Sequence, residues 1–387
     1  MISEETIKGQ ESWQIETGQV DLRVTKTGGH VAPVTFLRDT ATPVKPYFVA
    51  PWGEDNDGTL EPIIEILRGN FFCLPFGGGS VSGGKKYITH GETANNQWQL
   101  ERRDLSAGIH RIDLSLNTEA PRGKVEKSIA LKEGQNVIYT KHILKGYAGR
   151  FPLGYHATLD LPEEPGSVRV YKKRGYTAFT PSAGDLFAGN DYYSLKPDQK
   201  IDDLSRVETI WKDPSHTDCC LYPQRKGYSD ILQVFDADKS GPAWTIALVP
   251  SRGYLWFSLK NADVLPSTMF WISNGGRKWY PWNGSNRCLG LEDVCGFFAS
   301  GAASSVSANR LTAEGRETAR NLEDIGENSL NYIEGVAPIP PGFTSVEEVE
   351  LEEGRLIVTG PGTETVMVPV DWNFLTTGEV GALSQSK

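Results

Sequence analysis

The amino-acid sequence predicts an all-β protein built as a large antiparallel β-sandwich. Runs of apolar and β-branched residues recur along most of the 387-residue chain, and short glycine-containing turns separate them. The chain holds 41 Gly and 23 Pro, which is typical of many short strands joined by turns. Helical periodicity is scarce, so the strands do not alternate with helices as they do in a parallel sheet.

The predicted strands follow one another as hairpins. Residues 12–37 alternate between apolar and polar side chains, with turns at Gly18 and at Gly28-Gly29. Residues 124–146 are typical of a hairpin around Lys132-Glu133-Gly134. Further strand-like runs lie at 230–237, 243–250 and 254–261, and a last pair, at 346–360 and 365–372, turns at Gly354 and Gly360.

Two segments have a helical pattern. Residues 311–326 predict a helix that Thr312 would cap. Residues 57–69 predict only about one helical turn, because Pro62 limits the helix.

The length of the chain suits either one large sandwich or two domains. No internal repeat of fixed period divides it. We therefore expect residues 1–380 to form a single sandwich domain and residues 381–387 to be a disordered tail.

Composition and charge argue against several classes of partner. The net charge is −10 and no run of Lys or Arg stands out, so we expect no nucleic-acid partner. No apolar run of about 18 residues could span a bilayer, and the first residues do not look like a secretory signal, so we expect no membrane partner. The sequence gives no indication of the oligomeric state.

The cysteines and histidines do not have the spacing of a metal site. The six histidines form no HxH or HExxH pattern, and the five cysteines form no CxxC pair, so we expect no metal. An odd number of scattered cysteines favours buried free thiols in a reducing compartment, and we expect a cytoplasmic protein. The cysteines are Cys73, Cys219, Cys220, Cys288 and Cys295.

Two neighbouring segments carry the first functional signal. Residues 68–79 read Arg-Gly-Asn-Phe-Phe-Cys-Leu-Pro-Phe-Gly-Gly-Gly, and residues 90–98 read His-Gly-Glu-Thr-Ala-Asn-Asn-Gln-Trp. The glycines lack the Lys-Ser/Thr of a phosphate-binding loop, and no helical pattern follows them, so a phosphate loop is disfavoured.

Together the two segments resemble galactose mutarotase-like proteins (the aldose 1-epimerase family), and most of all the glucose-6-phosphate 1-epimerase branch. Members of that branch have an Arg-Gly-Gly strand, a Pro-x-Phe-Gly turn and a His-Gly-Phe-Ala-Arg-x-x-x-Trp segment. The matching positions in this chain are Arg68, Pro75, Phe76, Gly77, His90, Gly91, Ala94 and Trp98.

Two later segments extend the resemblance in the same order. Residues 154–159, Gly-Tyr-His-Ala-Thr-Leu, match the strand with the second histidine of the family, here His156. Residues 287–293, Arg-Cys-Leu-Gly-Leu-Glu-Asp, match the apolar strand that ends in the catalytic glutamate, here Glu292. The matches run from about residue 20 to residue 310, so the C-terminal strands lie beyond them.

The resemblance implies a galactose mutarotase-like supersandwich that interconverts the α and β anomers of a small-molecule carbohydrate, with no metal or organic cofactor. Glu292 would remove the proton of the C1 hydroxyl and His156 would protonate the ring oxygen. His90 would hold the C1 end and Arg68 would bind hydroxyls or an acid group. Trp279, in a tryptophan-rich run before the glutamate, is a candidate for stacking on the sugar.

Each of these residues also has a plain structural interpretation. His90 before a glycine could cap a turn, and His156 could be an ordinary strand histidine. Glu292 lies in an apolar run, where an ionised carboxylate costs several kcal/mol unless it is paired or faces a cleft. Asp293 should point to the opposite face of an extended segment.

The chain also departs from the pattern of the family. Glu92 and Asn95 stand where the family has Phe and Arg, which weakens the case for a sugar phosphate. Asp230 and Asp236 are the candidates for a further aspartate of the family, and neither is a firm match. Two alternatives therefore stay open. One is a sugar-binding protein without turnover. The other is a polysaccharide-acting enzyme such as a lyase, for which we expect a long open groove and a Tyr or Arg near the base, for instance Tyr155 or Arg68.

Overall fold

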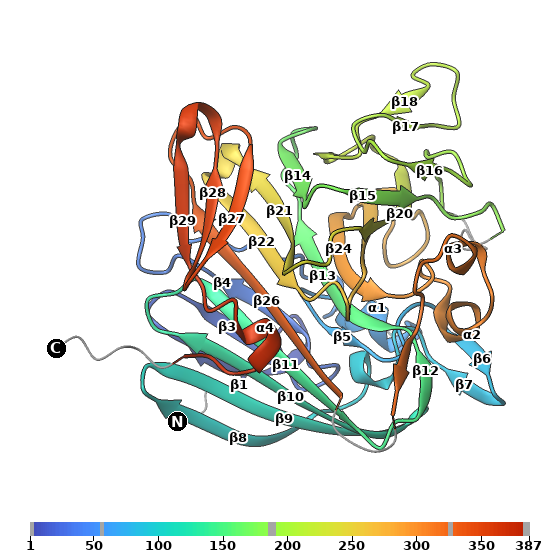
Figure 1. Ribbon diagram of the computed structural model, residues 1–387. Helices are drawn as coiled ribbons and strands as arrows, with labels where there is room; N and C mark the ends of the chain where they lie inside the picture. The colour runs from blue at the N-terminus through green and yellow to red at the C-terminus, as the bar shows by residue number, and fades with distance from the viewer. Residues whose placement is uncertain (1–3, 55–57, 185–190, 324–327, 382–387) are drawn as a thin grey trace.

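Two large antiparallel sheets form the body of the protein, whose computed structural model describes residues 4–54, 58–184, 191–323 and 328–381 (Figure 1). The nine-stranded sheet has the order β19-β14-β21-β22-β26-β11-β10-β9-β8, and the seven-stranded sheet has the order β16-β15-β20-β23-β24-β13-β5. The predicted all-β antiparallel sandwich is therefore confirmed.

The strands of the nine-stranded sheet are β8 (Gln99–Ser106), β9 (Ile109–Glu119), β10 (Arg122–Lys132), β11 (Val137–Lys145), β14 (Val168–Lys172), β19 (Leu221–Tyr222), β21 (Ala243–Val249), β22 (Tyr254–Lys260) and β26 (Asn328–Pro338). Those of the seven-stranded sheet are β5 (Phe72–Cys73), β13 (Leu153–Asp160), β15 (Tyr176–Phe179), β16 (Lys200–Ile201), β20 (Tyr228–Asp236), β23 (Ser267–Asn274) and β24 (Arg287–Cys295). The hairpin expected at residues 124–146 is the β10–β11 pair.

Smaller sheets and short helices complete the chain. The four-stranded N-terminal sheet consists of β1 (Glu4–Ile7), β2 (Gln10–Glu16), β3 (Asp21–Thr25) and β4 (Val31–Thr35). Two-stranded pairs are β6 (Ser80–Ser82) with β7 (Lys85–Tyr87), β12 (Gly149–Phe151) with β25 (Arg320–Leu322), and β17 (Val207–Glu208) with β18 (His216–Thr217). The helices are α1 (Pro62–Ile66), α2 (Gly301–Val306), α3 (Arg310–Ala313) and α4 (Phe374–Thr377).

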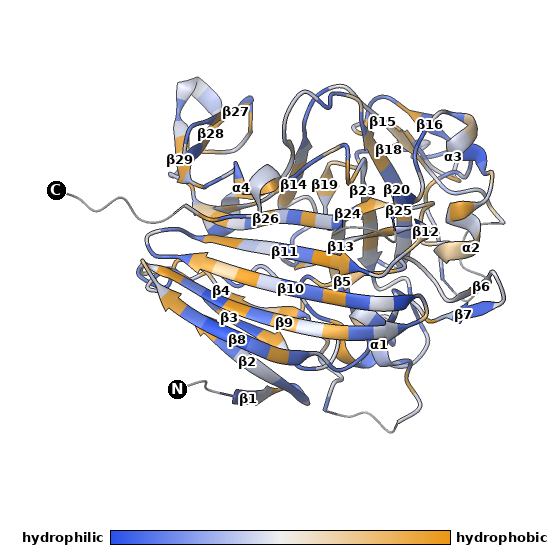
Figure 2. Ribbon diagram, turned by 60° about the horizontal axis from the view of Figure 1, so that its bottom comes forward, coloured by the Kyte–Doolittle hydropathy of each residue, from blue (hydrophilic) through white to orange (hydrophobic). Residues whose placement is uncertain are grey.

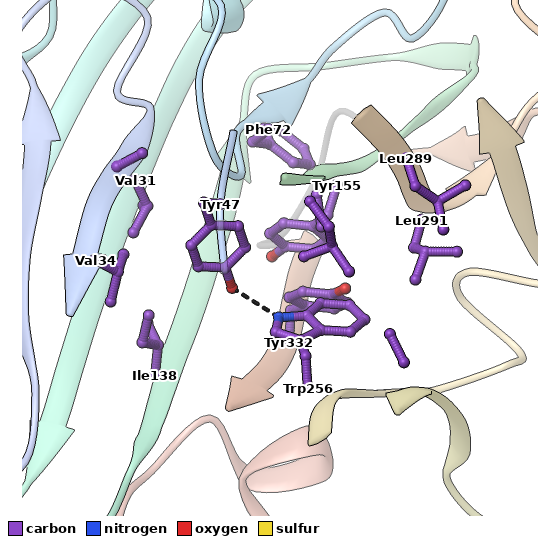
Figure 3. Close-up of a cluster of buried hydrophobic side chains, with 14 of the residues drawn as sticks. Val31, Val34, Tyr47, Phe72, Ile138, Tyr155, Trp256, Leu289, Leu291 and Tyr332 are labelled. Carbon is purple, nitrogen blue, oxygen red and sulfur yellow. Dashed lines mark hydrogen bonds between the residues drawn. The ribbon is translucent and has the colours of Figure 1, made fainter. Parts of the chain in front are cut away.

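The main core lies between the two large sheets. Tyr155 and Leu291 come from the seven-stranded sheet, and Trp256 and Tyr332 come from the nine-stranded sheet. Figure 3 shows these side chains meeting, with the Trp256 indole donating a hydrogen bond to Tyr47 at 3.0 Å. Burial of this many large apolar side chains supplies the main driving force for the packing of the two sheets.

The C-terminal strands form a separate cover on the far face of the nine-stranded sheet. The three-stranded sheet β27 (Glu348–Glu352), β28 (Arg355–Thr359) and β29 (Thr365–Pro369) stands at one end of the molecule in Figure 1, beside α4. Its buried apolar side chains pack on the outward side chains of β21, β22 and β26. Elsewhere on this sheet β8, β9, β10 and β11 lie side by side, with hydrophilic and hydrophobic residues along each strand (Figure 2).

The prediction of the longer of the two helices is wrong. The helix expected over residues 311–326 is only the four-residue α3, and Asn309 caps it in a capping box with Thr312. Gly315, at a positive φ of 72°, follows the helix, and the chain then extends into β25, which pairs with β12. The short turn expected over residues 57–69 is confirmed as α1.

Three further predictions concern the cysteines, membrane-spanning segments and the C-terminal tail. All five cysteines are free thiols, and four of them are buried. In the described ranges no helix has both the length and the apolar character that a membrane span needs. The tail expected at residues 381–387 falls outside the described residues except for Gly381.

A buried network of charges joins the sheets on the core face of β24. Asp293 is fully buried, and its carboxylate lies 2.8 Å from the Lys260 ammonium. Lys260 also contacts Asp236 at 3.0 Å, and Asp236 contacts Lys172 at 3.1 Å. Burial alone would raise the pKa of Asp293, but the two lysines and the hydrogen bonds hold it below its usual value. Asp293 is thus structural, as expected from its opposite facing on the strand.

Replacing Asp293 by Asn should therefore be costly. We expect D293N to lower the free energy of unfolding by about 3–5 kcal/mol at neutral pH, because it leaves Lys260 without one of its buried partners. A depressed carboxyl pKa stabilises the fold above the unfolded-state value of about 3.9, so the deficit should shrink as the pH falls below that value. Urea unfolding measures the effect.

The matched control is Asp238→Asn, which removes an exposed ion pair with Lys173. It should cost no more than about 1 kcal/mol. Equal losses in D293N and D238N would contradict the structural role given to the buried network.

Candidate functional site

The candidate site is a cavity on the outer face of the seven-stranded sheet, away from the main core. Its volume is about 590 Å³. The strands β13, β20, β23 and β24 form its floor, and α1, the loop before β8 and the loop between β23 and β24 form its walls. The lining residues are Glu61, Ile63, Ile64, Leu67, Gly78, Gly79, Thr89, His90, His156, Asp191, Ile231, Met269, Trp271, Arg277, Trp279, Trp282, Glu292 and Ala299.

Strand alternation places Glu292 in this cavity. Successive side chains of a strand point to opposite faces, so Leu291 and Asp293 face the core while Glu292 faces the cavity. Gly290 precedes it on the cavity face. A Cβ atom at Gly290 would lie 2.5 Å from the Glu292 carboxylate, so only glycine leaves the carboxylate its present position.

His156 and Glu292 are direct neighbours. They are register partners on the adjacent strands β13 and β24, and Nε2 of His156 lies 3.2 Å from Oε1 of Glu292. Nδ1 of His156 lies 3.1 Å from the Thr158 hydroxyl. Glu292 is completely buried, yet neither of its carboxyl oxygens forms a well-directed hydrogen bond with any described residue. The pair forms part of the floor of the cavity, and the carboxyl oxygens of Glu292 keep their hydrogen-bonding capacity.

Burial sets the protonation state of the pair. It raises the pKa of Glu292 well above its ordinary value, and the positive charge of Arg277 opposes this rise. It lowers the pKa of His156 well below its ordinary value, helped by the neighbouring His90. Burial therefore favours a neutral imidazole beside a protonated carboxyl group.

His90 completes the titratable cluster. Its ring centroid lies 4.9 Å from that of His156, with the two planes perpendicular. Nδ1 of His90 accepts a hydrogen bond from the Gly77 amide at 3.4 Å, so Nε2 is the nitrogen left to carry the proton of the neutral ring. Burial, with the charge of Arg277, lowers the pKa of His90 to about 3.

The loop that carries His90 is held tightly. His90 itself has a positive φ of 59°, an unusual conformation for a residue other than glycine. A Cβ atom at the next residue, Gly91, would lie 2.1 Å from the carbonyl oxygen of Leu74. Asn95, which stands where the family has an arginine, donates hydrogen bonds to the carbonyls of Thr89 and Gly91. The departure from the family pattern thus serves to fix the loop.

Aromatic rings surround the histidines. Phe71 is stacked between His30 and His156, at centroid distances of 4.1 and 4.5 Å. On the other side of His156, the Trp271 ring lies 5.8 Å away in an edge contact. These contacts restrict the rotation of the His156 ring.

Three tryptophans form an aromatic wall that runs from the floor strand β23 into the loop after it, and one of them is the predicted Trp279. The Trp279 indole donates a hydrogen bond to Asp191 at 3.2 Å, whereas the buried indole N–H groups of Trp271 and Trp282 have no described partner. The guanidinium of Arg277 lies over Trp271 and Trp282, 5.0 and 4.8 Å from their ring centroids. Sequence reasoning missed Asp191 and Arg277. Arg277 lay within the tryptophan-rich run, so its place beside Trp279 was the available signal.

Four residues considered from sequence lie elsewhere. Arg68 is fully buried, does not line the cavity, and donates hydrogen bonds to the carbonyls of Ile66, Ile7 and Lys8. Tyr155 faces the core and contacts His142. Asp230 accepts hydrogen bonds from Ser194 and Leu195, and Asp236 belongs to the lysine network.

These positions bear on the expectations for Arg68 and for a lyase. The contacts of Arg68 are those of a residue that ties the N-terminal strands to the body of the fold, so substrate binding by Arg68 has no support in this geometry. The lyase alternative expects a Tyr or Arg near the base; its two examples, Tyr155 and Arg68, do not line the cavity, whereas Arg277 does.

Among the described residues no group of three or more His, Cys, Asp or Glu side chains is arranged to hold a metal ion. The side chains that line the cavity offer several groups for chemistry. These are a carboxyl group and two imidazoles for proton transfer, a guanidinium, and indole N–H donors on an aromatic wall.

Comparisons with known proteins bear on the fold. No protein-family model and no curated protein matches the chain. A galactose mutarotase related enzyme from Lactobacillus acidophilus has a TM-score of 0.53 at 14% identity, over 88% of this chain and 100% of its own. A galactose mutarotase-like protein from Clostridium acetobutylicum has a TM-score of 0.57 at 12% identity, over 87% and 97%. A provisionally assigned aldose 1-epimerase from Klebsiella pneumoniae has a TM-score of 0.59 at 12% identity, over 87% and 83%.

At such identities the comparisons establish the fold alone. The chain has the galactose mutarotase-like fold, as the sequence predicts. A closer relation to the glucose-6-phosphate 1-epimerase branch has no support from them and stays a prediction.

The buried carboxyl group gives a prediction about stability. Because the pKa of Glu292 is raised in the folded state, that state holds its proton to a higher pH than the unfolded chain does. The wild-type protein should therefore lose stability as the pH rises above about 4.5, and Glu292→Gln should not. The difference in unfolding free energy should grow in favour of E292Q by up to about 1.4 kcal/mol per pH unit, until the folded-state pKa is reached.

Urea unfolding of both proteins at a series of pH values measures this difference. His90 and His156 are present in both, so their own titrations largely cancel. Glu314→Gln is the control, because Lys200 lowers the pKa of that exposed carboxyl group. E292Q and wild type with parallel stability–pH curves would show that Glu292 titrates normally.

Proposed function

We propose that the cavity binds a sugar in its ring form and interconverts its α and β anomers. The observation that carries the proposal is the pairing of a buried carboxyl group, whose oxygens lack hydrogen bonds, with an imidazole 3.2 Å away. The C1 hydroxyl oxygen and the ring oxygen of a pyranose are bonded to the same carbon. A base and an acid that serve both oxygens must therefore lie side by side, as Glu292 and His156 do.

The walls of the cavity favour a carbohydrate as ligand. A sugar presents hydroxyl groups that donate and accept hydrogen bonds, and C–H faces that pack on aromatic rings. The cavity offers the carboxyl oxygens of Glu292 and the indole N–H groups of Trp271 and Trp282, all without a hydrogen-bond partner among the described residues, and the ring of Trp279.

The reaction needs only the transfer of protons. The Glu292 carboxylate takes the proton of the C1 hydroxyl, the C1 carbonyl forms, and the bond from C1 to the ring oxygen breaks as His156 protonates that oxygen. The C1 carbonyl then rotates, and the ring oxygen attacks its other face. His156 recovers its proton, and Glu292 returns its own proton to the C1 oxygen.

Glu292 and His156 share one transferable proton. Glu292 holds this proton in the neutral state of the pair, and His156 holds it in the ionised state. Hydroxyl groups of a bound sugar that donate to Glu292 favour its ionised form. His90, whose Nε2 faces the same cavity, holds the C1 end by a hydrogen bond.

Exchange spectroscopy by NMR, which follows magnetisation between the α and β anomers, tests the proposal. Run over a panel of free aldoses and their 6-phosphates, it should reveal at least one sugar that exchanges faster than in buffer. Glu292→Gln and His156→Gln should each lower the rate by about 10²–10⁴-fold, the usual contribution of general acid–base catalysis.

Glu314→Gln, an exposed carboxyl group outside the cavity, should keep the full rate. Full rate in E292Q would show that Glu292 is not the base. Binding of a sugar without any exchange would favour the sugar-binding alternative over an enzyme.

A further inference from the structure

Arg277 holds a defined position in the loop between β23 and β24. Its Nε donates to the Asp191 carboxylate at 3.1 Å, and the Asp191 side chain is 5% exposed. Its guanidinium lies over the rings of Trp271 and Trp282. A salt bridge and stacking on two rings fix the planar group more firmly than a flexible surface cation would be fixed.

This position places a positive charge beside the proposed base. Trp271 is the register partner of Gly290, two residues before Glu292, and its ring also contacts His156. The guanidinium that covers Trp271 therefore lies on the ring that borders both members of the pair.

Within the described part of the chain, the other groups around Glu292 do not supply a positive charge. His156 faces it from β13, Met269 from β23 and Cys73 from β5, and His90 lies across the cavity. Burial lowers the pKa of both histidines and raises that of the Cys73 thiol, so all three are neutral at pH 7. The remaining charged lining residues, Glu61 and Asp191, are acidic.

We propose that Arg277, anchored by Asp191 and the tryptophan wall, is the counter-charge that allows the buried Glu292 carboxyl group to ionise. Arg277 is then a positioning residue, which acts on the reaction through the base. The inference rests on the proposed function of Glu292, but it concerns a property of the empty protein. Charges interact strongly where water is excluded, so one fixed guanidinium can oppose much of the cost of burying a carboxylate.

The test is a direct titration of Glu292 in the unliganded protein. Infrared spectroscopy of the carboxyl C=O stretch, with E292Q used to identify the signal, reports the protonation of Glu292 whether or not any sugar is turned over. In Arg277→Met the midpoint should move upward by at least one pH unit relative to wild type. In Arg277→Lys, which keeps the charge, it should lie between the two.

Arg225→Met is the matched control, because Arg225 also lies over an aromatic ring, that of Trp211 at 4.2 Å, but does not line the cavity. It should leave the Glu292 midpoint unchanged. A thermal unfolding curve checks that R277M folds, and R277K supplies the comparison if R277M does not. A midpoint in the folded variants within 0.3 unit of wild type would overturn the inference.

The pH dependence of sugar turnover provides a second test of the role of Arg277. If a sugar is turned over, the alkaline limb of the kcat/KM–pH profile, where the pair loses the one proton that catalysis needs, should move upward in R277M by the same amount as the titration, with R277K in between. A shifted titration without turnover of any sugar would support the role of Arg277 and contradict the proposed function. Turnover of a sugar with an unshifted titration of Glu292 would support the proposed function and contradict the role of Arg277.

Discussion

The two neighbouring carboxyl groups of β24 impose the constraint on which both the core and the cavity depend. Glu292 and Asp293 are completely buried on opposite faces of one strand. Asp293 receives an ammonium and hydroxyl donors, and its pKa falls. Glu292 receives no well-directed hydrogen bond, and its pKa rises. The fold thus stabilises the charge of Asp293, which helps to hold β24 in place. It leaves the Glu292 carboxyl group without hydrogen bonds, as expected where a ligand completes them.

The remainder of the site keeps these groups in place. Phe71 and Trp271 restrict the His156 ring, Gly290 leaves room for the carboxyl group, and Asn95 ties the His90 loop. Such support comes mostly from strands and from hydrogen-bonded loops, so the cavity is already shaped before a ligand arrives. Glu292 and His156 are buried, so electrostatic interactions with them are stronger than they would be in bulk water.

Sequence patterns predicted the fold class, most hairpins and the meeting of three distant residues. Residue alternation and glycine turns are local signals, and the order of the motifs around His90, His156 and Glu292 was enough to place them in one cavity. The helix expected over residues 311–326 failed because Gly315 and pairing of β25 with β12 outweigh local propensity.

The electrostatics of the site could not be predicted from the sequence. Arg68 matched the family motif, yet its position was set by carbonyl groups of the N-terminal strands. Asp191 and Arg277 meet across 86 residues of chain, a contact that no local pattern encodes. The protonation of His156 was equally out of reach, because burial, which the sequence does not show, moves its pKa well below the ordinary value.

The C-terminal cover has a consequence for biosynthesis. The apolar outer surface of β21, β22 and β26 is covered only when β28, β29 and α4 pack on it, and these elements follow all three strands in the chain. Until they are made, the nascent chain exposes an apolar sheet face, a state in which proteins aggregate or recruit chaperones. The order of translation therefore leaves this face uncovered between the synthesis of β26 and that of its cover.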